Sequence, residues 1–127
     1  MRKSLWITIV VFVAAMTVCV LSRTNINRLV NHARHLRTEA VEAMDAGDIQ
    51  NVEERLVELA GYINKNRGWL EVLCEHSDLH ELKINLIDAQ ASVEFGIRDD
   101  FYQAIYRFGE ALEHIADIEH IRFSNLY

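Results

Sequence analysis

The residues of this chain whose types and spacing suggest chemistry are histidines and a cysteine near its middle. His76 and His80 are four residues apart, and Cys74 comes two residues before His76. On a continuous helix, two histidines at this spacing share a face and can hold one cation. However, Ser77-Asp78 is typical of a helix start, which would place His76 in a turn, and no second cluster supplies the remaining ligands. The sequence therefore favours a histidine that bonds to a helix end over a metal site.

A further histidine, His114, lies beside the apolar face of the last expected helix. We predict that His76 and His114 lie close together at the edge of the domain, because a buried imidazole without a partner is costly. Their shared network would be either structural or the site of a ligand or metal ion. Helical bundles bind metals through Glu-x-x-His pairs, whereas Glu110 lies four residues before His114. We therefore expect no metal and no cofactor, with a His76/His114 ligand or metal sensor as the alternative.

Catalysis is not indicated by any motif. No serine, cysteine or lysine carries the signature of a nucleophile, and no glycine-rich phosphate loop occurs in the sequence. Cys19 lies inside an apolar run and Cys74 follows 55 residues later, so we expect no disulfide between them. The chain is predicted to be non-enzymatic.

Charge is distributed unevenly along the chain. The net charge of the 127 residues is −6, but the first 37 residues hold six basic residues and no acidic ones. All 19 acidic residues therefore lie in the remainder, against seven basic ones. A domain this acidic repels phosphate backbones, so we expect no nucleic-acid partner. The basic stretch instead suits lipid headgroups.

The first element is an apolar run from Leu5 to Leu21 that contains no charged residue. At ~1.5 Å per residue, a helix of this length nearly matches a ~30 Å hydrocarbon core. Trp6 stands where interfacial aromatic residues stand, and basic residues flank both ends. We predict that residues 1–22 form an uncleaved signal-anchor helix whose partner is the lipid bilayer. A cleaved signal peptide is the alternative, although no small-x-small cleavage site follows the run.

The orientation of this anchor follows from weaker signals. Basic residues are nearly balanced on its two sides, but signal-like N-termini usually stay in the cytoplasm. We therefore predict a single-pass protein of the cell membrane whose C-terminal domain, residues 23–127, is extracytoplasmic.

Residues 23–127 carry apolar side chains at alternating spacings of three and four. This period is that of helices with one buried face, whereas strands alternate every second residue. Turn signals at Asp45 to Asp48, at Asp78 with Glu81, and between Gly96 and Asp100 divide the region into four helices. We predict an all-α fold: an N-terminal transmembrane helix followed by a four-helix bundle or two packed αα-hairpins. The predicted buried stripes are Ile26, Leu29, Ala33, Leu36, Ala40 and Ala43; Ile49, Val52, Leu56, Leu59, Ile63, Leu70 and Leu73; Leu79, Leu82, Leu86, Ala89 and Val93; and Phe101, Ala104, Phe108, Ala111, Ile115 and Ile118.

Two aromatic residues suggest a partner surface beside the core. Trp69 comes one place before the stripe residue Leu70, and Tyr62 precedes the stripe residue Ile63. Aromatic side chains are enriched at protein interfaces, so Trp69 and Tyr62 are candidates for a partner-binding surface. Packing between the helical hairpins is the competing interpretation.

The order of several short motifs resembles the domain of unknown function 4363 family, small membrane-anchored proteins of spore-forming Firmicutes. The resemblance covers nearly the whole chain and rests on a charged start with an apolar helix, the turn from Asp45 to Asp48, Trp69 to His76 (WLEVLCEH), Leu112 to Ile115 (LEHI) and the ending Ser124-Asn125-Leu126. The family usually has acidic residues directly after its first histidine, whereas Ser77 intervenes before Asp78 here. The resemblance implies architecture and location, and it implies no activity.

These observations together predict a membrane-tethered, non-catalytic helical interaction module at the cell envelope. Its domain would bind a protein partner or self-associate. The alternative function, an envelope sensor of a ligand or metal ion, would use His76 and His114.

Overall fold

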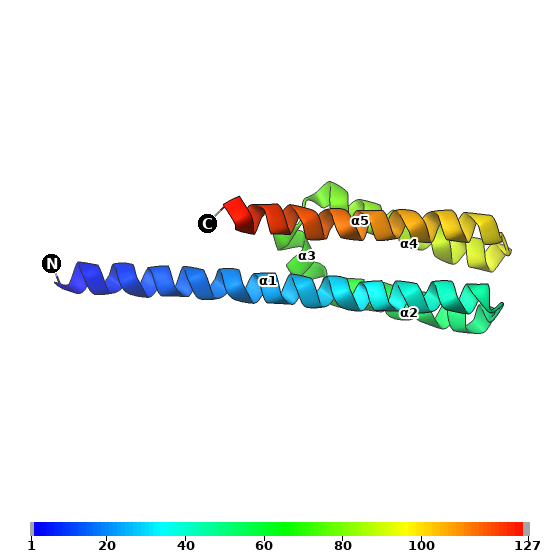
Figure 1. The fold of residues 1–127 in the computed structure, drawn as a ribbon, viewed down its shortest axis with the longest axis horizontal. Coiled ribbons are helices and arrows are strands. Elements are labelled where there is room, and N and C mark those ends of the chain that lie inside the picture. The colour runs from blue at the N-terminus through cyan, green and yellow to red at the C-terminus, as the bar shows by residue number, and fades with distance from the viewer. Residues whose placement is uncertain (1, 126–127) are drawn as a thin grey trace.

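The computed structural model describes residues 2–125, apart from the side chains of residues 22, 23, 73 and 118–125. Every element in this range is a helix and no strand occurs in it, so the prediction of an all-α chain is confirmed. The helices are α1 (Arg2–Asp45), α2 (Ile49–Lys65), α3 (Arg67–Leu73), α4 (His76–Phe95) and α5 (Arg98–Asn125) (Figure 1).

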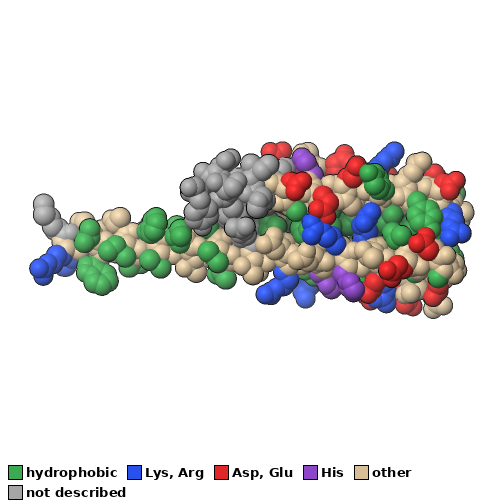
Figure 2. Space-filling model, viewed as in Figure 1, with side chains coloured by type: hydrophobic (Ala, Val, Ile, Leu, Met, Phe, Trp, Pro, Cys, Tyr) green, Lys and Arg blue, Asp and Glu red, His purple; other side chains and the backbone are tan. Residues whose placement is uncertain are grey.

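Helix α1 is one uninterrupted helix of 44 residues. No glycine or proline occurs between its ends, so nothing in its sequence breaks the backbone ladder. The hydroxyls of Thr8, Thr17 and Thr24 each donate to the carbonyl four residues earlier, which satisfies them within the helix. Its N-terminal part is long and apolar enough to cross a membrane, and no residue of that stretch is buried in the protein. Figure 2 shows hydrophobic side chains along this bare part of the helix, while charged side chains are spread among other residues over the face of the domain drawn there.

Two glycine turns fold the rest of the chain into hairpins. Gly47 and Gly96 have φ angles of +74° and +71°, a left-handed conformation that L side chains rarely adopt and that commonly ends helices. After the first turn, Asp48 caps α2 by accepting a hydrogen bond from the Asn51 amide at 3.3 Å. As a result, α1 packs on α2 and α4 on α5, and the pairs meet through contacts of α1 with α5 and of α2 with α4.

The predicted stripes make up most of the core, and Val30, Met44, Ile105 and Leu112 complete it. Among the stripe residues whose side chains the structure describes, all are buried except Ile49 and Ala111; Leu73 and Ile118 lie outside that set. Phe101 and Phe108 of α5 are the largest fully buried side chains. The first buried side chain along the described part of α1 is Ile26, close to the predicted start of the domain at residue 23.

Three helix boundaries differ from the sequence prediction. The second stripe does not run through one helix to residue 73, because α2 ends at Lys65 and α3 begins at Arg67. Asn66 makes this break: its side-chain Nδ2 donates to the Tyr62 carbonyl at 2.9 Å, an alternative to the helical ladder, and Gly68 follows.

The other two differences concern helix starts. Helix α4 begins at His76 rather than at Asp78, because the Glu75 carbonyl already accepts the amides of Asp78 and Leu79. His76 thus opens α4 and does not lie in the preceding turn. Helix α5 begins at Arg98, two residues before Asp100.

Candidate functional site

A pocket lies where α1 leaves its apolar segment and meets the junction of α2 and α3. Helix α1 contributes Asn25 and Arg28, and the α2–α3 segment contributes Tyr62, Asn66 and Trp69. The structure therefore brings together the two aromatic residues that the sequence singled out. Its other lining residues are apolar and buried: Ile26, Leu29 and Leu70.

The two aromatic residues have different environments. Tyr62 is half-buried and its ring lies against His32, with ring centroids 4.3 Å apart and planes tilted by 55°. Trp69, by contrast, is 47% exposed. Tyr62 thus takes part in packing between α1 and α2, within the first hairpin, while Trp69 presents its indole to the surroundings.

Helix α3 exposes a second apolar side chain on the same side. Val72 lies three residues after Trp69 and is 78% exposed, and residues three apart on a helix share a face. The charges of this helix neutralise each other, because Arg67 Nε donates to Glu71 Oε1 at 2.7 Å. That hydrogen bond, together with the positive charge of Arg67, lowers the pKa of Glu71 below its usual value. The outer face of α3 is therefore apolar with a locally neutral pair beside it.

The structure pairs His114 with Asp78. His114 Nδ1 lies 3.2 Å from Asp78 Oδ1, a contact that joins the first turn of α4 to α5. No hydrogen bond or ion pair connects His114 with His76 among the described side chains. Nor does the described part of the chain group three or more histidine, cysteine, aspartate or glutamate side chains so that they could hold a metal ion. The geometry of His114 is that of a surface contact between helices.

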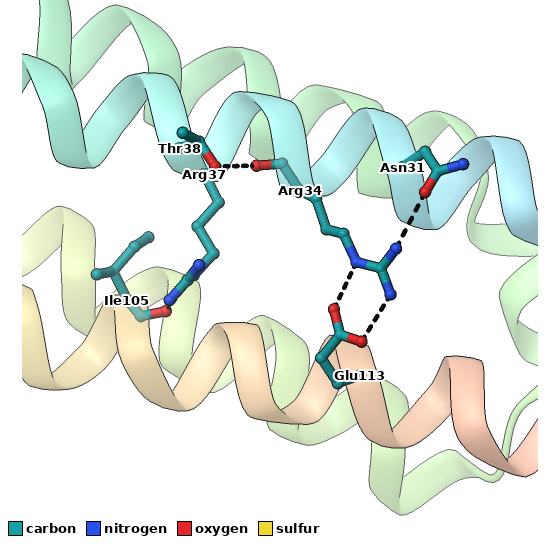
Figure 3. Close-up of polar contacts among 6 residues, drawn as sticks. All are labelled: Asn31, Arg34, Arg37, Thr38, Ile105 and Glu113. Carbon is teal, nitrogen blue, oxygen red and sulfur yellow. Dashed lines mark hydrogen bonds and ion pairs between the residues drawn. The ribbon is translucent and has the colours of Figure 1, made fainter.

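Two arginines of α1 form hydrogen bonds with α5, and we call this row of polar contacts the polar seam (Figure 3). Arg34 donates from Nε and Nη2 to the two carboxylate oxygens of Glu113 at 2.5 and 2.6 Å, and Arg37 Nε donates to the Ile105 carbonyl at 3.0 Å. The hydrogen bonds from Arg34 lower the pKa of Glu113 below its usual value. A side chain at Gly109 would collide with this seam, because its Cβ would lie 2.6 Å from Arg37 Nε.

Sequence reasoning assigned these arginines only to a basic stretch. The signal that could have revealed their role is Gly109, a glycine inside a helical pattern, since such a residue often marks a close approach of another group.

The opposite end of the domain carries exposed apolar residues that the sequence analysis did not identify. Phe95 is 75% exposed and Ile97 is 47% exposed, one on each side of the turn residue Gly96. Ile49, predicted to be buried, is 45% exposed and starts α2 beside the other turn. Ile49 and Ile97 line one shallow depression between the two turns. We call Ile49, Phe95 and Ile97 the turn patch; its signal in the sequence is the presence of bulky apolar residues beside turn glycines, where polar residues are usual.

Comparison of the chain with protein-family models, with curated proteins and with solved structures finds no match.

Proposed function

We propose that this chain is a membrane-tethered, non-catalytic helical interaction module at the cell envelope. The observation that carries the proposal is the continuity of α1. An apolar stretch that nothing in the protein covers continues without a break into a helix whose Ile26, Leu29 and Ala33 are buried in the domain core. Such a stretch is unfavourable in water and suits a bilayer. The domain is therefore held at a fixed distance from the membrane.

The proposed architecture of the domain is a four-helix bundle. Each of the four long helices contacts two others, in the closed order α1, α2, α4, α5. This ring of contacts surrounds one apolar core, and α3 serves as the connection between the two hairpins. The proposal includes membership in the domain of unknown function 4363 family, which the order of the short motifs supports.

The turn patch is the proposed contact for a protein partner. It lies at the end of the domain away from the apolar segment. One cation, Arg98, lies at its edge and donates to the Met44 carbonyl. The exposed acidic residues that flank it outnumber this cation: Asp48, Glu94, Asp99 and Asp100. Two copies joined patch to patch would bring these acids together, which is unfavourable. The surface instead suits a protein with an apolar centre and a basic rim.

The anchor is tested by disrupting its apolar run. We expect the full-length protein to stay in the membrane pellet after carbonate washing, with its original N-terminus by intact-mass analysis. The double substitution Ile9→Arg/Val13→Arg should move it to the supernatant, because each central arginine costs ~2.5–3.5 kcal/mol on insertion. The matched control Ile9→Leu/Val13→Leu should stay in the pellet. A mature N-terminus near Ser22, or wild-type protein in the supernatant, would contradict the anchor.

A labelling experiment in the same cells tests on which side of the membrane the domain lies. A Tyr127→Cys reporter in a Cys74→Ser background should react with an impermeant maleimide in intact cells, since the domain is proposed to be extracytoplasmic. Labelling that appears only after lysis would place the domain in the cytoplasm.

The partner surface is tested by photo-cross-linking from position 97 in cells. We expect a heteromeric product whose yield falls by about twofold to thirtyfold in Asp99→Asn/Asp100→Asn, because rim charges each contribute ~0.2–1 kcal/mol to such contacts. Glu54→Gln, on the exposed side of α2, should leave the yield unchanged. A product with the mass of two copies would show self-association instead, and a yield insensitive to the aspartates would refute a basic partner.

A further inference from the structure

The base of the domain lies within reach of the lipid headgroups once the apolar segment is in a bilayer. The residues that α1 contributes to the pocket begin with Asn25 and end with Leu29, four to eight residues after Leu21. At ~1.5 Å per residue this places the pocket about 6–12 Å beyond the apolar run. The headgroup layer extends about 5–8 Å beyond the hydrocarbon on each side. The pocket and α3 therefore stand at the outer edge of that layer.

The C-terminal end of α5 also lies close to the expected membrane surface. Helices α1 and α5 run in opposite directions, and Glu113 is bonded to Arg34 (Figure 1). Twelve residues separate Glu113 from Asn125, as they separate Ser22 from Arg34. The backbone of α5 thus ends level with Ser22, directly beside the end of the apolar run. The whole base of the domain, and not α1 alone, approaches the membrane plane.

The side chains that this base exposes include several that are typical of a membrane interface, together with the acidic residues Glu71 and Glu75. Trp69 and Val72 point outward from α3, and tryptophan is the aromatic residue enriched at headgroup level. Arg28 and Lys65 are exposed beside the pocket and form no ion pair with any described side chain. Lys83, Arg98 and Arg107 likewise form no ion pair with a described side chain, whereas Arg34 and Arg55 are paired with glutamates. Two unpaired cations therefore lie next to exposed apolar groups, at the one end of an acidic domain that faces the membrane.

From this arrangement we propose that α3 and the adjoining pocket form a docking surface for anionic phospholipids around the anchor. Trp69 and Val72 enter the interfacial layer, and Arg28 and Lys65 lie against the headgroup phosphates. Apolar burial and attraction to anionic lipid are the two contributions that hold interfacial elements on membranes. This proposal rests on the anchoring proposed above, because the anchor sets the height of α3.

Two single-tryptophan proteins test the docking in vesicles. Trp6→Phe leaves Trp69 as the reporter, and Trp6→Phe/Trp69→Phe/Tyr106→Trp places a reporter of similar exposure on α5, well above the base. Both proteins are reconstituted into vesicles of phosphatidylcholine alone or with phosphatidylglycerol. Each vesicle also contains a lipid with a nitroxide on its headgroup, which quenches the fluorescence of nearby tryptophans. Flotation of the vesicles on a density gradient reports the anchor independently.

We expect both proteins to float and Trp69 to be quenched at least threefold more than the Tyr106→Trp reporter in phosphatidylglycerol vesicles. Arg28→Gln/Lys65→Gln should lower the ratio of docked to undocked protein roughly tenfold or more. Each basic residue near an anionic membrane surface contributes on the order of 1 kcal/mol to binding. If the protein floats but the two reporters are quenched equally, docking of α3 would be refuted and the proposal of a membrane anchor would be retained. Protein that does not float would refute both proposals, and quenching of Trp69 that ignores lipid charge and Arg28→Gln/Lys65→Gln would refute the role of anionic lipid.

Discussion

We expect truncation of Phe108 to alanine to lower the free energy of unfolding by about 3–5 kcal/mol, and truncation of Tyr106 on the same helix to change it by less than about 1 kcal/mol. Phe108 is fully buried between the hairpins, so its removal costs the apolar burial of the ring and leaves a cavity. Tyr106 is 60% exposed and loses little. A domain of this size has about 5–15 kcal/mol of stability, so the first loss is a large part of the total.

Chemical denaturation of the full chain in detergent, followed by helical circular dichroism, measures both values. Leu56→Ala and Leu86→Ala, from α2 and α4, are expected to cost about 2–5 kcal/mol each, and Glu53→Ala is expected to be nearly neutral. Equal losses at Phe108 and Tyr106 would mean that the buried face of α5 is assigned wrongly.

The second large effect is expected from a proline in α1. Asn31→Pro should destabilise the domain by ~3 kcal/mol or more, because it removes an amide from the helical ladder and its ring clashes with the carbonyl four residues earlier. Asn31 is exposed, so the substitution removes no core packing. The control Asn31→Ala keeps the backbone amide and removes only the side-chain oxygen that accepts from Arg34 at 3.0 Å. It should lie within about 0.5 kcal/mol of the wild type, as most exposed substitutions do.

The same denaturation measurement separates the two substitutions. If Asn31→Pro proved as stable as Asn31→Ala, α1 would not be a continuous helix through this position, and the observation behind the proposed tether would be lost.

The sequence was sufficient to predict the helices and their buried faces, because a period of three and four residues records burial directly. Val52, Leu82 and Phe101 are buried as their positions in the stripes require. It failed where the same pattern continued through a break: Leu70 stands in register after Asn66, so apolar spacing alone could not show that a separate helix begins there. The prediction that Ile49 is buried was also wrong. Ile49 fits the apolar spacing of the stripe, but it is the first residue of α2 and lies beyond the end of the core.

The candidate sites were harder to predict because they depend on contacts between distant segments. Trp69 and Tyr62 were recognised by residue type, but only the fold shows that α1 completes their pocket with Asn25 and Arg28. His114 was predicted to lie close to His76, and the structure shows it in contact with Asp78, which lies two residues after His76 in the first turn of α4. A pattern within one helix cannot specify the rotation of that helix against its neighbour.

The unbroken α1 also makes the domain a lever arm. Asp45, at the far end of the helix, lies 24 residues beyond Leu21, which is about 36 Å at ~1.5 Å per residue. Membrane-spanning helices change their tilt as the thickness of the bilayer changes. A tilt of about 10° in the membrane would carry the turn patch sideways by roughly 6 Å, more than the diameter of a bound water molecule and enough to make or break a protein contact. A stiff helix would thus convert a small change in lipid thickness into a displacement that a partner at the far end can detect.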